Sequence, residues 1–127
     1  RQLTVDLVEY SSAKRASETF NLIKDSLLFS NCKKNLALYS FNAESLMDII
    51  SHKPNEVNDF LLIGHNPGIE DLVNQLVSIE DNAKELAVLR SKYPTGAIAF
   101  IELNILYWSD LRKNCGRLVE FIRPKDI

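Results

Sequence analysis

Long hydrophobic runs, cysteines and metal-ligand patterns are all scarce in this chain of 127 residues. No apolar run approaches the ~20 residues that a helix needs to cross a bilayer, so we expect no membrane span. The two cysteines, Cys32 and Cys115, lie far apart, which favours free thiols in a reducing compartment and a cytoplasmic protein. The two histidines, His52 and His65, are not at metal-binding spacing, so we expect no metal site.

An excess of charge of one sign is also missing. The chain has 15 basic and 17 acidic residues that are interspersed along its length, which gives no footprint for nucleic acid or for an anionic membrane. It lacks a glycine-rich loop with a lysine, a G-x-G-x-x-G and a G-x-S-x-G motif, so no cofactor is expected. Its hydrophobic content of 46% is enough for a single domain over residues 1–127, with a core that needs no disulfide or structural metal.

The first half of the chain alternates predicted strands with predicted helices. Residues 5–10 read as a strand, and Ser11 and Ser12 are N-cap candidates for the following helix. The sequence LALY at 36–39 predicts a second strand, and residues 45–50 predict a second helix. The first helix is indicated by apolar residues at offsets of three and four: Ala13, Ala16, Phe20, Ile23 and Leu27.

The middle of the chain contains the clearest strand and the clearest helix. Residues 60–63, FLLI, form a continuous apolar run that is typical of a strand in a parallel sheet covered on both faces. Asn66 can cap the next helix, Pro67 suits its first position, and Glu70 and Asp71 favour the positive end of its dipole. The apolar stripe of this helix is Ile69, Leu72, Val73, Leu76 and Val77.

The last third of the chain predicts an antiparallel hairpin. Two strand-like runs, AIAFIELNILYW and GRLVEFIRP, are separated by a polar connection that contains Ser, Asp, Asn and Gly. No repeat or Pro/Gly-rich linker divides the chain. The predicted fold is therefore α/β: a three-layer α/β/α sandwich whose mostly parallel sheet has an antiparallel C-terminal edge.

Two strand-to-helix junctions are the candidate site, because ligands of parallel sheets bind beyond the carboxyl ends of the strands. In VEYSSAKR, Arg15 falls in the opening turn of a helix; in LLIGHNPG, His65 lies beside the free N–H groups of the next helix. If the two strands are neighbours, both side chains converge on one anion. The alternatives are a solvated surface arginine and a structural histidine. Tyr39 could line the same crevice, although packing is the commoner role, and His52 in its polar loop reads as a solvated side chain.

These segments resemble the histidine phosphatase superfamily, whose fold is phosphoglycerate mutase-like. VDLVEYSSAKRASETFNLI resembles its second phosphate-pocket segment, and LLIGHNPGIEDLVNQL is similar to its later strand-His-helix segment. YPTGAIAFIEL, a Trp-containing connection and GRLVEFIRP are similar to the C-terminal part of its short bacterial branch, the phosphohistidine phosphatases. The resemblance covers residues from about 5 to 124.

The resemblance implies a metal-independent phosphatase that acts on a phosphorylated protein through a phosphohistidine enzyme intermediate. Arg15 would clamp the phosphoryl oxygens, and His65 would be the second pocket histidine and not the nucleophile. Ser12 and Asn66 would contribute to phosphate or substrate binding, with helix capping as the favoured role of Asn66. The implied partner is a protein that carries phosphohistidine, or a small phosphorylated substrate.

One part of the family pattern is absent. The nucleophile of the family is the histidine of an Arg-His-Gly motif at the end of the first strand, and this sequence contains no Arg-His-Gly. Because Ser11 already lies at the turn, we expect the sequence to be N-terminally incomplete and to lack the family's first strand. Glu9 and Glu44 are the nearest carboxylates, without a spacing that makes either a general acid. Two alternatives stay open: a small-molecule phosphomonoesterase, and a non-catalytic module that binds phosphate or a phosphoprotein.

Overall fold

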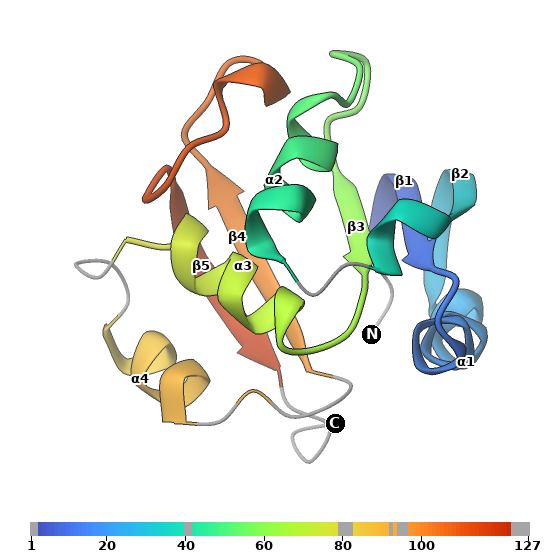
Figure 1. Cartoon of the computed structure of the whole chain (residues 1–127), viewed down its shortest axis with the longest axis horizontal. Helices are drawn as coiled ribbons and strands as arrows, with labels where there is room; N and C mark the ends of the chain where they lie inside the picture. Colours follow the sequence, from blue (N-terminus) through green and yellow to red (C-terminus); the bar gives the residue numbers. More distant parts are fainter. Residues whose placement is uncertain (1–2, 40–41, 79–82, 92, 94–96, 123–127) are drawn as a thin grey trace.

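The structure is a computed structural model that describes residues 3–39, 42–78, 83–91, 93 and 97–122 (Figure 1). Residues 94–96, which carry part of the YPTGA motif, lie outside the described residues. The strands are β1 (Leu3–Ser11), β2 (Leu27–Asn35), β3 (Phe60–Ile63), β4 (Ile98–Leu103) and β5 (Gly116–Ile122). The α-helices are α1 (Lys14–Ile23), α2 (Ala43–Ser51), α3 (Gly68–Leu76) and α4 (Ala83–Ser91), and the 3₁₀ turns are η1 (Lys24–Ser26), η2 (Leu36–Tyr39) and η3 (Trp108–Asp110).

The first three strands form a parallel sheet in the order β2-β1-β3. In its register, Tyr10 of β1 is the partner of Ile63 of β3, so both strands end at the same edge. The amino end of β3 is held to β1 by Asp6, whose carboxylate accepts the backbone N–H groups of Asn58 and Asp59 at 2.7 and 3.0 Å. These hydrogen bonds stabilise the charged carboxylate and lower the pKa of Asp6.

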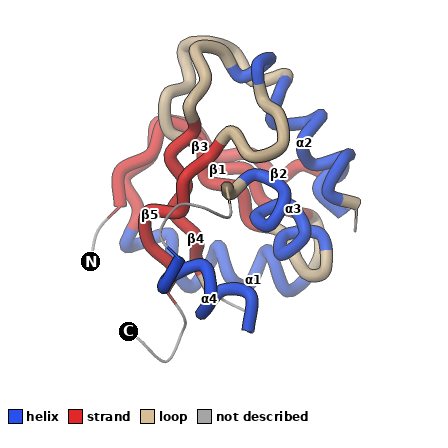
Figure 2. Tube along the Cα trace, turned by 90° about the vertical axis from the view of Figure 1, so that its left-hand side faces the viewer, coloured by secondary structure: helices blue, strands red, loops and turns tan. Residues whose placement is uncertain are grey.

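Helices cover both faces of this parallel sheet (Figures 1 and 2). Side chains alternate along a strand, so Leu61 and Ile63 of β3 point to one face and Phe60 and Leu62 to the other. The first pair joins a cluster with Ala16 and Phe20 of α1, together with Val8 and Leu27. The second pair packs against the cluster that contains Leu46 and Ile50 of α2. The predicted α/β/α layering is therefore confirmed for the parallel sheet.

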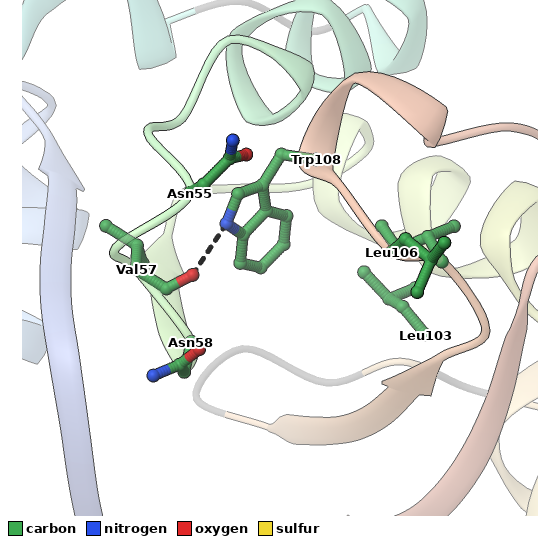
Figure 3. Close-up of a pocket in the computed structure, with 7 residues that line it drawn as sticks. Asn55, Val57, Asn58, Leu103, Leu106 and Trp108 are labelled. Carbon is green, nitrogen blue, oxygen red and sulfur yellow. Dashed lines mark hydrogen bonds between the residues drawn. The ribbon is translucent and has the colours of Figure 1, made fainter.

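The antiparallel hairpin is also confirmed, with Ile98 opposite Ile122 and Leu103 opposite Gly116. Among the described residues its two strands form a sheet of their own, so the expected antiparallel edge is not hydrogen-bonded to the parallel sheet. Its long connection is tied to the parallel sheet by Trp108, whose indole Nε1–H donates to the Val57 carbonyl at 2.7 Å (Figure 3).

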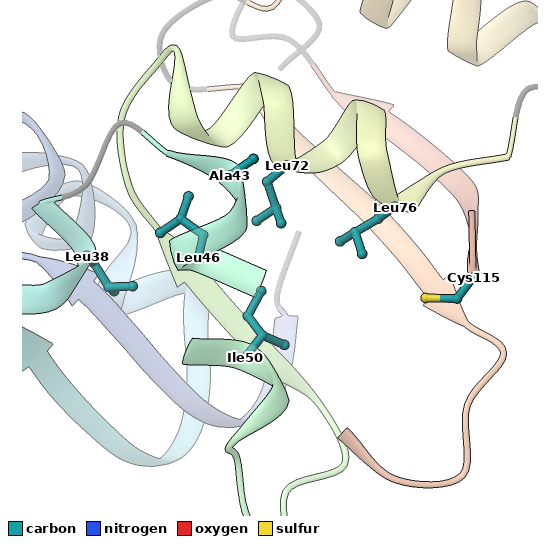
Figure 4. Close-up of a cluster of buried hydrophobic side chains, with 7 residues drawn as sticks. All are labelled: Leu38, Ala43, Leu46, Ile50, Leu72, Leu76 and Cys115. Carbon is teal, nitrogen blue, oxygen red and sulfur yellow. The ribbon is translucent and has the colours of Figure 1, made fainter. Parts of the chain in front are cut away.

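A shared hydrophobic cluster joins the two sheets where hydrogen bonds do not. Its buried members come from η2, α2, α3 and the turn before β5 (Figure 4): Leu38, Ala43, Leu46, Ile50, Leu72, Leu76 and Cys115. Phe60 and Leu62 of β3 and Ile101 and Leu103 of β4 pack against it from the two sheets. The opposite stripe of α3 is also buried, because Val73 and the following Val77 pack with Leu118 of β5 and with α4. Helix α3 is therefore buried on two sides.

Two predictions for residues 24–39 are wrong. The first helix ends at Ile23, and Leu27 is the first residue of β2 instead of the last residue of a helical stripe. LALY is the 3₁₀ turn η2, in which Leu38 enters the core and the Asn35 side chain accepts the Ala37 N–H at 3.0 Å. The sequence did not indicate β2 because eight of its nine residues lack core burial, so its side chains carry no two-residue alternation.

The expected helix caps are also shifted. Ala13, and neither Ser11 nor Ser12, is the N-cap of α1, and Pro67 is the N-cap of α3 and follows a cis peptide bond. Helix α4 was not predicted because its sequence is only weakly periodic. The two cysteines are free, with Cys32 exposed and Cys115 buried, as expected. Within the described part of the chain, no helix is long and apolar enough to span a membrane.

Candidate functional site

The two strand-to-helix junctions lie side by side, as a shared anion site requires. Strands β1 and β3 are parallel neighbours, and their last paired residues are Tyr10 and Ile63. Ser12 and His65 follow these positions by two residues each, at the same edge of the sheet. Helices α1 and α3 start directly after these turns, so the positive ends of two helix dipoles are at that edge.

In the first turn, Ser11 has a structural role and Ser12 is the more accessible residue. Ser11 is fully buried, and its Oγ accepts the Ala13 N–H at 3.1 Å. The Ser11 carbonyl accepts the Ser17 hydroxyl at 3.5 Å, which fixes the entry into α1. Ser12 is half-buried in the turn. The turn therefore uses Ser11 to hold the backbone and leaves Ser12 at the surface of the edge.

Arg15 is the second residue of α1, and its side chain is exposed. The first turn of α1 also contains Lys14 and no acidic residue, and no side chain caps its N–H groups. Two cations at the positive end of a helix are unfavourable unless an anion or water compensates them. Within the described residues, the Arg15 guanidinium has no ion-pair partner, whereas Lys14 lies 3.9 Å from Glu18. The turn is thus electrostatically suited to an anion.

His65 is half-buried at the start of the second turn. The preceding Gly64 allows close packing, because a Cβ atom there would lie 2.8 Å from Cδ1 of Ile69 in α3. The imidazole contacts the Tyr39 ring, with a centroid separation of 5.4 Å and an interplanar angle of 64°. Tyr39 is the last residue of η2, so this contact joins η2 to the turn that follows β3. The sequence motifs alone do not reveal this contact, because LALY at 36–39 reads as a strand in the sequence.

Asn66 performs the capping role that the sequence favoured, although it is not the formal N-cap. Its Oδ1 accepts the Glu70 N–H at 3.2 Å, and its Nδ2 donates to the Tyr93 carbonyl at 3.0 Å. These bonds connect the start of α3 to the segment before β4. Both ends of the amide are thus engaged in holding the backbone, which fits a cap better than a ligand.

Tyr93 makes this segment sensitive to high pH. It is buried and packs on Phe121 at a centroid distance of 5.1 Å. Burial, with a smaller contribution from the negative charge of Glu70, raises the pKa of Tyr93 to about 12. An unfolded tyrosine has a pKa of about 10, so the folded state holds this proton more tightly.

We expect the stability due to the neutral Tyr93 phenol to be fully present below pH 10 and to be lost as the pH rises toward 12. At about pH 11 the loss through this one group is about 1 kcal/mol. Urea unfolding of the wild type and of Tyr93→Phe at about pH 8 and about pH 11 measures it. The variant should lose less stability over this interval; an equal loss would contradict the assignment.

The two candidate carboxylates are not equivalent. Glu9 is buried, and its carboxylate binds the Lys53 ammonium and accepts the Asn35 amide N–H at 2.8 Å. It is therefore engaged inside the fold and is not a free general acid. Glu44 is exposed in the first turn of α2, where its Oε1 accepts the Gln75 amide at 3.4 Å.

The other histidine and a small pocket lie away from this edge. His52 follows the last residue of α2, is exposed, and has its Nδ1 2.7 Å from the Asp48 carbonyl. A pocket of about 160 Å³ lies at the amino end of β3 (Figure 3) and is lined by Asn55, Val57, Asn58, Leu103, Ile105, Leu106 and Trp108. His65 follows the carboxyl end of the same strand. In the described ranges, no three His, Cys, Asp or Glu side chains are grouped to hold a metal ion.

Comparisons with known proteins identify the fold. No family model matches the sequence, and no curated protein sequence matches it. Two solved structures, each named "putative phosphohistidine phosphatase SixA", are similar to this chain. The structure from Nakamurella multipartitia has a TM-score of 0.75 and 21% identity, and the match covers 94% of this chain and 71% of that one. The structure from Agrobacterium tumefaciens has a TM-score of 0.70 and 22% identity, with 94% and 68% covered. The chain therefore has the phosphoglycerate mutase-like α/β fold that its motifs predicted.

Proposed function

We propose that the edge formed by Ser12, Arg15 and His65 is a phosphate pocket of the phosphohistidine phosphatase type, which acts without a metal on a phosphorylated protein. The observation that carries this proposal is the β1–β3 register, which makes the two motif-bearing turns neighbours. The exposed Arg15 fork can bind two phosphoryl oxygens at once. The N-terminus of α1, whose first turn contains no acidic residue, faces the same edge and favours the same negative charge. The names of the two similar structures support this substrate class.

In this proposal the residues divide the work of phosphoryl transfer. Arg15 and the N–H groups of α1 stabilise negative charge on the equatorial oxygens, and His65 donates a hydrogen bond to one of them. Ser12 contacts the phosphate from the turn, whereas Asn66 holds α3 in place. An imidazole leaving group needs little acid assistance, so the proposal assigns no general acid.

A non-catalytic phosphate-binding module is the second candidate for these 127 residues taken alone. The chain has two histidines, and His52 lies outside the site. His65 is then the one imidazole at the pocket, and the proposal assigns it to oxygen binding. We therefore expect the 127-residue chain to bind phosphate and to hydrolyse phosphohistidine slowly or not at all.

The binding test compares two neighbouring cations of α1. Orthophosphate and a phosphohistidine-bearing protein are titrated into the wild type, Arg15→Ala and Lys14→Ala, and affinities are measured by calorimetry. Arg15→Ala should weaken binding by about 10- to 100-fold, which is the effect of losing charge-assisted hydrogen bonds. Lys14→Ala should change it much less, because Lys14 is highly exposed and faces Glu18. Equal losses in both variants would indicate non-specific charge attraction and contradict the pocket.

Phosphate release from the phosphohistidine protein separates the two candidate functions. Binding without release supports the module, and binding with release that requires Arg15 supports the phosphatase. Fast release that His65→Ala abolishes would make His65 the nucleophile and overturn its proposed role.

A further inference from the structure

We infer that Tyr39 is a positioning residue for His65, which fixes the imidazole in the orientation that the phosphate pocket needs. This inference deepens the proposed function and rests on it for the identity of the ligand. The contact between the two rings does not depend on the proposed function, because the ring separation of 5.4 Å and the angle of 64° are properties of the fold. Edge-to-face pairs with centroids about 4.5–7 Å apart are the favoured arrangement of aromatic rings.

The placement of Tyr39 is not explained by burial of its own ring. Its neighbour Leu38 is 1% exposed and anchors η2 in the cluster that joins the two sheets. Tyr39 itself is 56% exposed. Since the anchor of η2 is Leu38, the Tyr39 ring is directed along the sheet edge to the imidazole instead of into the core.

The contact between Tyr39 and His65 joins two segments that are separated by a strand of the sheet. Tyr39 follows β2, His65 follows β3, and β1 lies between them in the sheet. The turn η2 therefore passes over the carboxyl end of β1, where the Ser12 turn and the start of α1 are located. Tyr39 thus borders the same edge as the residues of the proposed pocket.

A fixed imidazole is chemically useful at this position. An imidazole on a half-buried strand end can occupy several staggered χ1 wells, and only some of them direct a ring nitrogen to a given oxygen. A second ring packed edge-on restricts these rotations. Tyr39 can therefore orient His65 through ring packing.

The test uses Tyr39→Leu, Tyr39→Phe and Leu36→Ala. Leu36 is the matched control, because it lies on the same 3₁₀ turn and is 73% exposed. The measurements are the three-bond χ1 couplings of His65 by NMR, orthophosphate affinity by calorimetry, and thermal stability. Tyr39→Leu should average the His65 couplings and weaken phosphate binding by about 2- to 10-fold, the range expected for one aromatic pair. Tyr39→Phe and Leu36→Ala should resemble the wild type.

The outcomes separate this inference from the proposed function. Unchanged His65 couplings in Tyr39→Leu overturn the positioning role, whether or not phosphate binds. A phenylalanine variant that behaves like the leucine variant also overturns it, because the ring edge alone would then be insufficient. Wild-type protein that fails to bind orthophosphate contradicts the proposed pocket, while the couplings still decide whether Tyr39 orients His65.

Discussion

Replacing Lys53 by methionine is expected to lower the free energy of unfolding by about 3–5 kcal/mol, because it leaves a buried carboxylate without its counter-charge. The Lys53 and Glu9 side chains are 12% and 3% exposed, and the Lys53 ammonium also lies 5.4 Å from the centre of the Phe60 ring. The amide of Asn35 would remain as a neutral partner of Glu9. Urea unfolding followed by the fluorescence of Trp108 measures the change.

Two comparison variants show whether the unpaired Glu9 carboxylate causes the loss of stability. Lys14→Met removes an ammonium from a pair that is 89% and 60% exposed, and its effect should lie within about 0.5 kcal/mol. The double variant Glu9→Gln/Lys53→Met removes both charges and should recover most of the lost stability. A Lys53→Met loss as small as that of Lys14→Met would show that the Glu9 carboxylate is not held charged inside the fold.

Leu46→Ala should cost a similar amount, about 3–5 kcal/mol, because it leaves a cavity in the cluster that joins the two sheets. Leu46 is 1% exposed and packs among residues from η2, α3 and both sheets (Figure 4). The described strands of the two sheets share no ladder hydrogen bonds, so side-chain packing has to transmit stability between them. We therefore expect the amides of the hairpin to exchange faster in the variant, with a smaller change in the parallel sheet.

Hydrogen exchange of the β4 and β5 amides, read beside urea unfolding, measures both effects. Leu22→Ala is the matched control, since Leu22 is 83% exposed on α1 and its truncation should be nearly neutral. A Leu46→Ala variant that unfolds at the wild-type urea concentration would contradict the role assigned to this cluster. An equal increase in the exchange rates of the β1 and β4 amides would also contradict it, because the two sheets would then unfold as one cooperative unit.

The sequence pattern predicted a helix or strand correctly wherever the segment itself contains an apolar run or an apolar stripe. Phe60–Ile63 is a strand with the predicted bounds, and the stripe of α3 is buried as expected. The antiparallel pairing of β4 and β5 followed from two apolar runs with a polar connection. Each of these elements carries its apolar residues in a run or stripe of its own, so the sequence pattern alone indicates it.

The candidate site was predictable only as two separate turns. SSAKR and GHNPG indicated Arg15 and His65, and the adjacency of β1 and β3 makes them neighbours. The sequence motifs did not predict the contact between Tyr39 and His65, because this contact depends on a turn that crosses the end of β1. Glu9 illustrates the same limit, since its partner Lys53 lies 44 residues away in sequence.

The sequence by itself determined the α/β class, the strands with apolar runs and the two turns of the candidate site, because each of these depends on residue types within a short window. Only the tertiary structure decided that the polar segment Leu27–Asn35 is an edge strand, that LALY is a 3₁₀ turn, and that the hairpin forms its own sheet. The physical reason is that backbone pairing with β1 stabilises β2, and the burial of Leu38 stabilises η2. Both depend on neighbours that are distant in sequence and leave no periodic signal in the segment itself.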